Sequence, residues 1–253
     1  MIRRLALAGA AAVLAFAGTA CTSTPSDNVD GAATTTITVA AAASLTDVFE
    51  TIGAEFTASS GIEVTFSFAA SSAIGEQIRG GAPLDAFASA GTSAMKPLAD
   101  EQLVTDVTDF ATNTLAIAVP AGNPGGVNGL ADLARVSVVV CEEQVPCGVA
   151  TTALLERNAL AISPVSFEPD VRSVLGKIVA DEADAGIVYV TDLVDREGVE
   201  AVSIPVDANV STTYQAAIVT ESPHAEAARA FVAFLDGPEA QAALAAAGFA
   251  PAP

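Results

Sequence analysis

The sequence predicts an α/β protein whose parallel strands are covered by helices on both faces. Short apolar runs typical of buried strands alternate with longer stretches in which apolar residues recur every three or four positions, as in amphipathic helices. The same alternation begins again after residue 113. The chain of 253 residues has room for one large domain or for two lobes of about 110 residues each.

The first half of the folded chain predicts three strands and two helices. Residues 37–41 form an apolar run that predicts a buried strand, and the apolar positions within 45–56 share one face of a helix. Alternating apolar and polar residues predict a second strand at 62–68. A short helix ends at Arg79 before a pair of glycines, and a third strand follows at 84–88.

The second half continues the alternation and ends in alanine-rich helices. Strands are predicted at 114–119, 136–140, 165–167, 185–190 and 214–220. Helices are predicted around 154–155 and at 171–180, 224–235 and 239–247. Strands that alternate with helices in this way indicate parallel sheets that are buried on both faces.

Residues 1–20 predict an export signal. Two arginines precede an apolar stretch at 5–17, which is too short to span a bilayer as a mature helix. Small residues lead directly into Cys21, which favours a lipoprotein signal with the lipid on Cys21; ordinary cleavage near Ala20 is the alternative. Residues 21–36 have the composition of a polar linker. We therefore expect an exported protein, either periplasmic or held by its lipid at the outer face of the cell membrane.

The charge balance excludes several classes of partner. Thirty acidic residues against ten basic ones give a net charge of −20 and a pI near 4.1. Nucleic acid and anionic membrane surfaces therefore repel the chain. The hydrophobic fraction of 51% comes largely from 55 alanines and does not indicate an integral membrane protein.

Residues with the chemistry of enzymes or metal sites are sparse. The spacing of Cys141 and Cys147 in an oxidising compartment favours a disulfide between them. The sequence has one histidine, His224. A nucleophilic pair of Cys147 and His224 would indicate a secreted hydrolase, but the compartment and the second cysteine disfavour it. No cluster of histidines and cysteines has the spacing of a zinc site.

Small hydroxyl residues follow two of the predicted strands. Ser44 follows the first strand, and Asp47 three positions later completes a pattern typical of a capping box. Ser71 and Ser72 follow the second strand. Because the carboxyl ends of parallel strands share one edge of a sheet, both helix N-termini are expected at one crevice. Their free N–H groups and partial positive charge predict an anion site without lysine or arginine, and pure capping is the alternative.

Several short motifs occur in a fixed order between residues 37 and 250. They are AAASLT at 41–46, SFAASS at 67–72, GAPLDAFASA at 81–90, VPCG at 145–148, PDVR at 169–172 and GIVY at 186–189. In this order they resemble the periplasmic molybdate-binding proteins of ABC importers. The resemblance implies a receptor that closes on a tetrahedral oxyanion, is not an enzyme and uses no cofactor.

The same resemblance implies a type II periplasmic-binding-protein fold, which has two α/β lobes with mixed sheets and a hinge between them. Lobe one would comprise residues 37–116 and 216–253, and lobe two residues 117–215. The hinge would lie near Ile117 and Ala216.

The resemblance further implies a ligand set for the molybdate oxyanion, with no cation site. Ser44 and Ser71 match the family's two hydroxyl ligands in lobe one, and each would give its O–H and its backbone N–H. Cys147, at a position where the family has alanine, would give a backbone N–H. Val171 would likewise give only its N–H, at the first turn of a helix capped by Asp170. Tyr189 matches the family's phenolic ligand.

The implied partners are molybdate, tungstate and an ABC transporter permease, which would receive the ligand from a monomeric receptor. A receptor for sulfate or another tetrahedral oxyanion is the alternative within this class, and the cysteine-dependent hydrolase is the alternative outside it. A site made only of donors is expected to reject oxyanions that carry a proton, because no acceptor waits for that proton.

Overall fold

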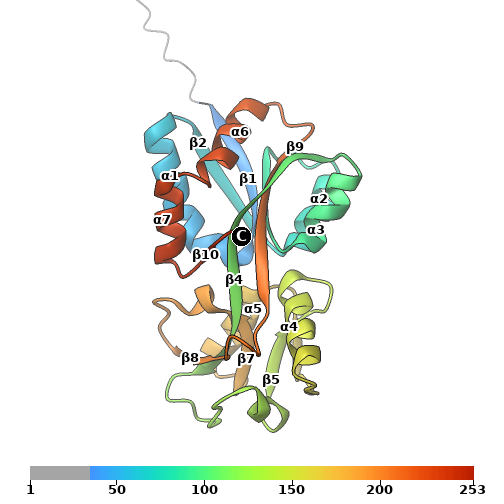
Figure 1. Ribbon diagram of the computed structural model, residues 1–253, viewed down its shortest axis with the longest axis vertical. Helices are drawn as coiled ribbons and strands as arrows, with labels where there is room; N and C mark the ends of the chain where they lie inside the picture. Colours follow the sequence, from blue (N-terminus) through green and yellow to red (C-terminus); the bar gives the residue numbers. More distant parts are fainter. Residues whose placement is uncertain (1–34) are drawn as a thin grey trace, which may run out of the picture. The chain divides into compact units, whose positions relative to one another are not determined.

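The computed structural model describes residues 35–253. The predicted export signal at 1–20, the predicted lipidation of Cys21 and nearly all of the predicted linker at 21–36 lie outside the described residues. Within the described range, no helix has both the length and the apolar character needed to cross a membrane. Figure 1 shows the elements of this range arranged as two lobes that are joined by two long strands.

The strands form one mixed sheet, so the predicted α/β class is confirmed. Its order is β2-β1-β3-β9-β4-β7-β5-β6, and β8 and β10 also pair with β4. The three strands at each end of this order are parallel to one another, whereas β4 and β9 are antiparallel to their neighbours. The strands are β1 (Thr36–Ala42), β2 (Glu63–Ala69), β3 (Ala86–Ala90), β4 (Val104–Pro120), β5 (Val138–Cys141), β6 (Ser166–Glu168), β7 (Ala185–Tyr189), β8 (Val199–Ser203), β9 (Ser211–Val219) and β10 (Ala250–Pro251).

Helices cover both faces of the sheet in lobe one, as Figure 1 shows. The α-helices are α1 (Thr46–Ser60), α2 (Ser71–Arg79), α3 (Thr92–Asp100), α4 (Pro146–Arg157), α5 (Val171–Val179), α6 (Ala225–Phe234) and α7 (Pro238–Ala246), and the 3-10 helices are η1 (Ala43–Leu45), η2 (Leu130–Ala134) and η3 (Val190–Leu193). Helices α2 and α3 pack on one face of lobe one, and α1, α6 and α7 pack on the other. Helices α4 and α5 pack on the strands of lobe two.

Two strands carry the chain between the lobes. Strand β4 pairs with β9 over 104–114 and then with β7 and β8 over 115–120. Strand β9 begins with Ser211, which pairs with Thr114 at the point where β4 changes partners. We propose that the hinge lies at these two residues, a few positions before those expected from the sequence.

Three elements escape prediction from the sequence. Helix α3 contains Pro97 in its interior, where proline removes a backbone hydrogen bond and disfavours a helix. The first half of β4 and all of β8 are largely exposed on their outer sides, so they lack the apolar run by which a buried strand is recognised. These segments are held by pairing with distant strands, which leaves no local sequence signal.

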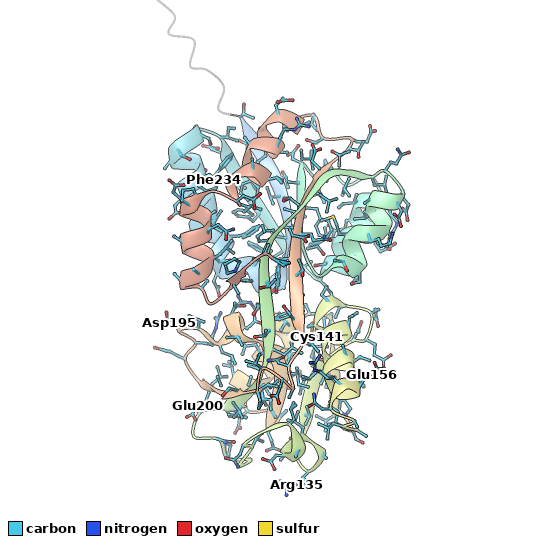
Figure 2. The ribbon with its side chains drawn as sticks, viewed as in Figure 1. Arg135, Cys141, Glu156, Asp195, Glu200 and Phe234 are labelled. Atoms are coloured by element: carbon cyan, nitrogen blue, oxygen red, sulfur yellow. A yellow bond between two sulfur atoms is a disulfide. The ribbon has the colours of Figure 1, made fainter. Side chains whose placement is uncertain are left out.

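The cores of the two lobes differ in composition. In lobe one the ring of Phe49 lies 5.6 to 6.0 Å from the rings of Phe66, Phe110 and Phe231, an aromatic cluster centred on α1. The core of lobe two is built mainly from valine, isoleucine and leucine. Figure 2 marks Phe234 at the edge of the aromatic cluster and Cys141 in lobe two.

Candidate functional site

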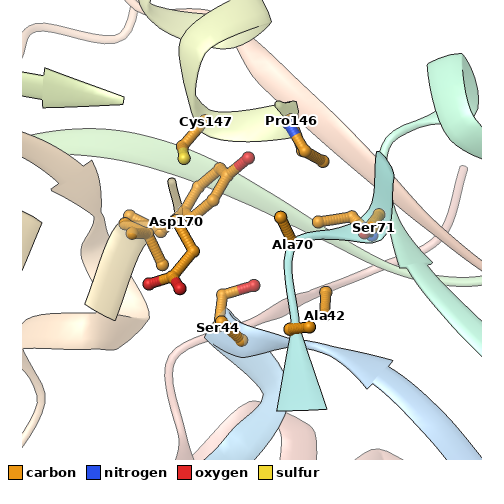
Figure 3. A pocket seen from close by; sticks show the side chains of 12 residues that line it. Ala42, Ser44, Ala70, Ser71, Pro146, Cys147 and Asp170 are labelled. Carbon is orange, nitrogen blue, oxygen red and sulfur yellow. Dashed lines mark hydrogen bonds between the residues drawn. The ribbon is translucent and has the colours of Figure 1, made fainter. Parts of the chain in front are cut away.

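A small pocket lies where the carboxyl ends of the parallel strands of both lobes meet. Its lining residues follow β1, β2, β3, β6 and β7 or begin α4, and they are Ala42, Ala43, Ser44, Ala69, Ala70, Ser71, Ala90, Pro146, Cys147, Asp170, Val171 and Tyr189. Figure 3 shows Ser44 and Ser71 of lobe one opposite Pro146 and Cys147 of lobe two. The cavity measures about 20 Å³, far below the roughly 300–1,000 Å³ of sites for drug-sized molecules. Its size suits an ion of a few atoms.

Three α-helices begin at this pocket. Helix α2 begins at Ser71, α4 at Pro146 and α5 at Val171, and all three of these residues line the cavity. The first N–H groups of a helix have no partner within the helix, and the aligned peptide dipoles give the N-terminus about half a positive charge. None of the lining residues is lysine, arginine or histidine. The lining residues therefore offer positive partial charge only through backbone groups, which come from both lobes.

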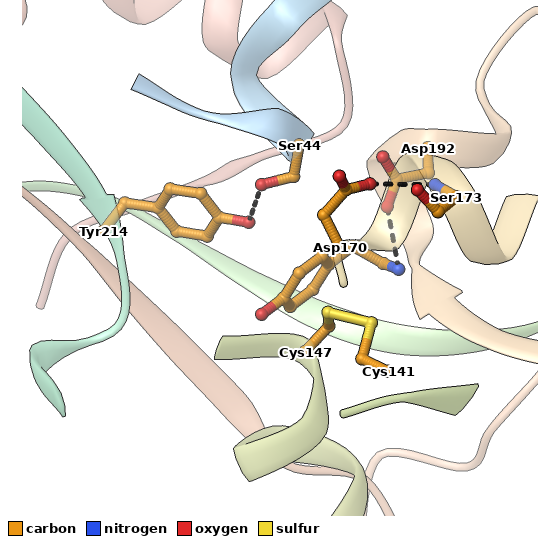
Figure 4. Close-up of a disulfide and its surroundings, with 8 residues drawn as sticks. Ser44, Cys141, Cys147, Asp170, Ser173, Asp192 and Tyr214 are labelled. Carbon is orange, nitrogen blue, oxygen red and sulfur yellow. Dashed lines mark hydrogen bonds between the residues drawn. A yellow bond between two sulfur atoms is a disulfide. The ribbon is translucent and has the colours of Figure 1, made fainter. Parts of the chain in front are cut away.

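Ser44 lies in the pocket but is not a helix cap. It is 5% exposed and sits in η1, one turn before α1, whose first turn has no side-chain cap. The capping box predicted for Ser44 and Asp47 is therefore wrong. The Ser44 Oγ atom instead lies 2.8 Å from the hydroxyl of Tyr214, as Figure 4 shows. Because Ser44 lies in η1 and not at the start of α1, its side chain contacts Tyr214 on β9 instead of the N–H groups of α1.

Ser71 is likewise bonded to the sheet and not to its own helix. It is the first residue of α2 and fully buried, and no side chain caps that helix. Its Oγ accepts a hydrogen bond of 3.0 Å from the backbone N–H of Ala90, at the end of β3. Because a backbone N–H can only donate, the hydroxyl hydrogen of Ser71 remains free to point elsewhere. The pocket is beside it.

Cys147 enters the pocket through the first turn of α4. It forms a disulfide with Cys141, as the sequence predicts, and the two Cα atoms are 5.7 Å apart. Gly148 makes this packing possible, since a Cβ atom there would lie 1.8 Å from the carbonyl oxygen of Glu142. Figure 4 shows the bridge beside the pocket. The bridge ties the end of β5 to the start of α4 and so fixes the backbone at Cys147.

Val171 contributes backbone rather than side chain. Its side chain is 3% exposed and packs in the core of lobe two. Asp170 caps α5 by accepting a hydrogen bond of 2.8 Å from the N–H of Ser173, as the sequence predicts. Asp170 is also among the residues that line the pocket. That the site holds its ligand with donors alone stays a prediction.

Tyr189 brings a buried hydroxyl without a hydrogen-bond partner. It ends β7, is 1% exposed, and its Oη bonds to none of the described residues. Burial raises the pKa of Tyr189 far above its usual range. The hydroxyl therefore keeps its proton at neutral pH. A buried hydroxyl without a partner at the edge of a pocket is available to donate a hydrogen bond to a ligand there.

The structure does not form the nucleophilic pair of Cys147 and His224. The sulfur of Cys147 is bonded to Cys141, and His224 Nδ1 lies 3.2 Å from Asp85 Oδ1 in lobe one. Within residues 35–253, no group of three or more histidine, cysteine or acidic side chains is placed to hold a metal ion. The site has the donors of an anion site rather than the ligands of a cation site.

Comparison with known proteins agrees with this geometry. The family model for bacterial extracellular solute-binding proteins matches residues 37–250. The chain belongs to this family. It is 40% identical over 233 residues to the molybdate-binding protein ModA of Mycobacterium tuberculosis, covering 90% of this chain and 88% of that one. It is 32% identical to ModA of Escherichia coli, over 81% and 84% of the two chains.

A solved structure supports the same family at the level of the fold. The substrate-binding domain of a putative molybdenum ABC transporter from Clostridium difficile superposes with a TM-score of 0.67 and 26% identity, covering 87% of this chain and all of that one. The mixed sheet and the two lobes are thus those of a solute-binding protein. This class of protein works as a receptor rather than as an enzyme.

Charged side chains join the two lobes of this solute-binding protein at the rim of the pocket. Asp47 on α1 accepts hydrogen bonds of 2.7 Å from both Arg172 on α5 and Arg196 after η3. Arg172 Nε also donates to the carbonyl oxygen of Ala43, directly before Ser44. Motif PDVR therefore places Asp170 and Val171 at the pocket, and the next residue, Arg172, reaches across to the opposite lobe. The sequence analysis missed this contact because its partner lies far away in the chain.

Proposed function

We propose that this protein binds molybdate, and with it tungstate, through Ser44, Ser71, Cys147, Val171 and Tyr189. The observation that carries the proposal is the convergence of these five residues, from five separate segments, on one cavity of ionic size. Relatives at 40% and 32% identity bear the name molybdate-binding protein. Hydroxyls and backbone N–H groups from both lobes would surround the oxyanion.

The donors available are strong enough for tight binding without a basic side chain. A hydrogen bond to a charged acceptor contributes about 1.5–3 kcal/mol, so five to seven such bonds hold a dianion firmly. The helix N-termini add an attractive potential that acts at short range. The net charge of −20 lies on the surface at large, and solvent ions screen it over about 10 Å.

Asp170 changes the basis of selectivity. Its carboxylate would repel a dianion, and it offers an acceptor to an oxyanion that carries a proton. The carboxylate accepts a hydrogen bond from the N–H of Ser173, which fixes its position at the start of α5. We infer that rejection of hydrogen phosphate depends on cavity size together with the donors, and not on the donors alone.

We further propose that the protein delivers its ligand to the permease of an ABC transporter and does no bond chemistry itself. The supporting fact is membership of the extracellular solute-binding family. Lipid anchoring through Cys21 and a monomeric state belong to the same proposal. The mass of Cys21 in membrane extracts tests the anchor, and light scattering of the secreted form tests the monomer.

Thermal unfolding with one oxyanion at a time tests the ligand. A ligand at about a thousand times its Kd stabilises a protein by about 4 kcal/mol. We expect a large rise in the unfolding temperature with molybdate and with tungstate, and little change with phosphate. An equal rise with sulfate would overturn the assignment of molybdate, and no rise with any of the four would overturn an oxyanion site.

A further inference from the structure

A line of buried polar side chains runs from the pocket through the two strands that join the lobes. The Tyr214 hydroxyl on β9 lies 2.8 Å from Ser44 Oγ and 3.5 Å from Asn113 Nδ2 on β4. The same Asn113 nitrogen lies 2.8 Å from Thr191 Oγ1 in η3 of lobe two. All four residues are at least nine-tenths buried. The line therefore connects a candidate ligand residue of lobe one with lobe two through the hinge.

The orientation of the Asn113 amide follows from a backbone group. The N–H of Thr114 donates to Asn113 Oδ1 at 2.9 Å. Since that N–H can only donate, the amide oxygen faces Thr114 and the amide nitrogen faces Tyr214 and Thr191. The nitrogen has two hydrogens and no acceptor capacity, which matches its two contacts. Both neighbouring hydroxyl oxygens must therefore accept from Asn113.

Either hydroxyl can donate in the bond between Ser44 and Tyr214, and the contact with Asn113 favours Tyr214 as the donor. The Tyr214 oxygen accepts from Asn113, so its own hydrogen is available for Ser44 Oγ. Burial raises the pKa of Tyr214 well above its usual value, so the phenol keeps this hydrogen at neutral pH. With Ser44 Oγ as the acceptor of this bond, the Ser44 hydrogen is left for the pocket. Ser71 reaches the same state by accepting from the N–H of Ala90.

We propose that Tyr214 and Asn113 are positioning residues that fix the Ser44 hydroxyl as a donor into the pocket and so tune the affinity for an unprotonated oxyanion. The inference rests on the proposed function, because it takes the bound anion as the acceptor of Ser44. Without the Tyr214 hydroxyl, Ser44 would be free to rotate its hydrogen away from the ligand. Binding of the anion would then have to orient the Ser44 hydroxyl again, and this cost would reduce the observed affinity.

A double-mutant cycle on molybdate affinity tests the proposal. Tyr214→Phe keeps the ring and removes only the hydroxyl, and we expect it to raise the Kd about three- to tenfold, the effect of one neutral hydrogen bond. In a Ser44→Ala background the same change should have almost no further effect, because Tyr214 acts through Ser44. Calorimetric titration of the four proteins with molybdate gives the four Kd values.

A matched control separates positioning from packing. The ring of Phe249 lies 5.2 Å from that of Tyr214 and is also buried, but this side chain has no hydrogen-bonding group. Phe249→Leu should lower the unfolding temperature while leaving the Kd within about twofold, since it touches packing alone. Unfolding curves of every variant establish that each protein is folded when it is titrated.

The outcomes distinguish this inference from the function on which it rests. Losses that simply add in the double variant, or an unchanged Kd for Tyr214→Phe, would overturn the positioning role and leave molybdate binding intact. A failure of the unaltered protein to bind molybdate would overturn the proposed function and this inference with it. A Phe249→Leu variant that weakens binding as much as Tyr214→Phe would assign the effect to packing.

Discussion

The two halves of the pocket prepare their donors in opposite ways. In lobe one, Ser71 and Ser44 are already hydrogen-bonded to the sheet, through Ala90 and Tyr214. In lobe two, the hydroxyl of Tyr189 is buried with no hydrogen bond to any described residue. The difference teaches that the fold already holds the two proposed serine ligands, whereas the proposed ligand Tyr189 would gain its partner only from the anion.

This contrast has an energetic meaning. A buried polar group without a partner costs about 1–3 kcal/mol, so the free protein carries that cost at Tyr189. In the proposed complex the bound anion would remove this cost. Ser71 already makes one hydrogen bond within the fold, and the anion would add a second. Substitutions in the two halves should therefore affect stability with opposite signs and affinity with the same sign.

The largest expected effect is that of Ser71→Ala. The variant loses a hydrogen bond to the anion, for about a ten- to hundredfold weaker affinity, and it leaves the buried N–H of Ala90 without an acceptor. The molybdate Kd should therefore rise, and the unfolding temperature of the free protein should fall. Ser72→Ala is the matched control, since Ser72 lies in the same turn but does not line the pocket. If the two variants behave alike, Ser71 is not a ligand.

Tyr189→Phe should separate affinity from stability. The loss of one O–H donor weakens molybdate binding about tenfold or more, while the loss of an unpaired buried hydroxyl stabilises the free protein by about 1 kcal/mol. Calorimetric titration and thermal unfolding of the ligand-free form measure the two effects. A free protein that loses stability to the same extent as Ser71→Ala would contradict the difference between the half-sites.

Removal of the disulfide tests whether Cys147 acts through its backbone. A variant with both Cys141→Ala and Cys147→Ala keeps every N–H of α4 and loses a short covalent loop, for which chain entropy predicts about 2 kcal/mol of stability. Unfolding should occur at a lower temperature, and the molybdate Kd should rise only a few-fold. A loss of binding as large as that of Ser71→Ala would show that the sulfur atoms themselves matter.

The smallest effect concerns a buried acid directly behind Tyr189. Burial raises the pKa of Asp192 from 3.8 to about 7, although Arg172 and the N–H of Tyr189 oppose the shift. Between these two values the folded protein holds a proton that the unfolded chain has lost. The resulting stability is therefore complete below about pH 4 and is lost as the pH rises through 7.

Asp192→Asn should remove that dependence. The asparagine amide keeps an oxygen that accepts from the N–H of Tyr189. Unlike the carboxylate, this amide does not take up a proton between about pH 4 and 7. Unfolding temperatures at pH 5, 6, 7 and 8 should fall with pH more steeply for the unaltered protein than for the variant. Parallel curves for the two proteins would show that Asp192 stays charged throughout. Arg172, Arg196 and Asp47 face this carboxyl group and are present in both proteins.

Much of the fold was predictable because its signals are local. The apolar periodicity predicted α5 and β7 within a residue or two, and an aspartate before an apolar helix predicted the cap at Asp170. Helix α3 and strand β8 were not predictable, because they depend on pairing and packing with segments far along the chain. The cysteine spacing was sufficient to predict the disulfide.

The sequence by itself determined which groups reach the pocket. Hydroxyl residues placed directly after parallel strands collect at the carboxyl edge of the sheet, which predicted Ser44 and Ser71 at one crevice. The family resemblance added Cys147, Val171 and Tyr189, and all five residues line the pocket. Only the tertiary structure decided what each of them is bonded to. Ser44 and Tyr214 are 170 positions apart, and a hydrogen bond across that separation leaves no periodicity, spacing or charge pattern in the chain. Asn113, on another strand, contacts the Tyr214 hydroxyl and favours it as the donor of that bond.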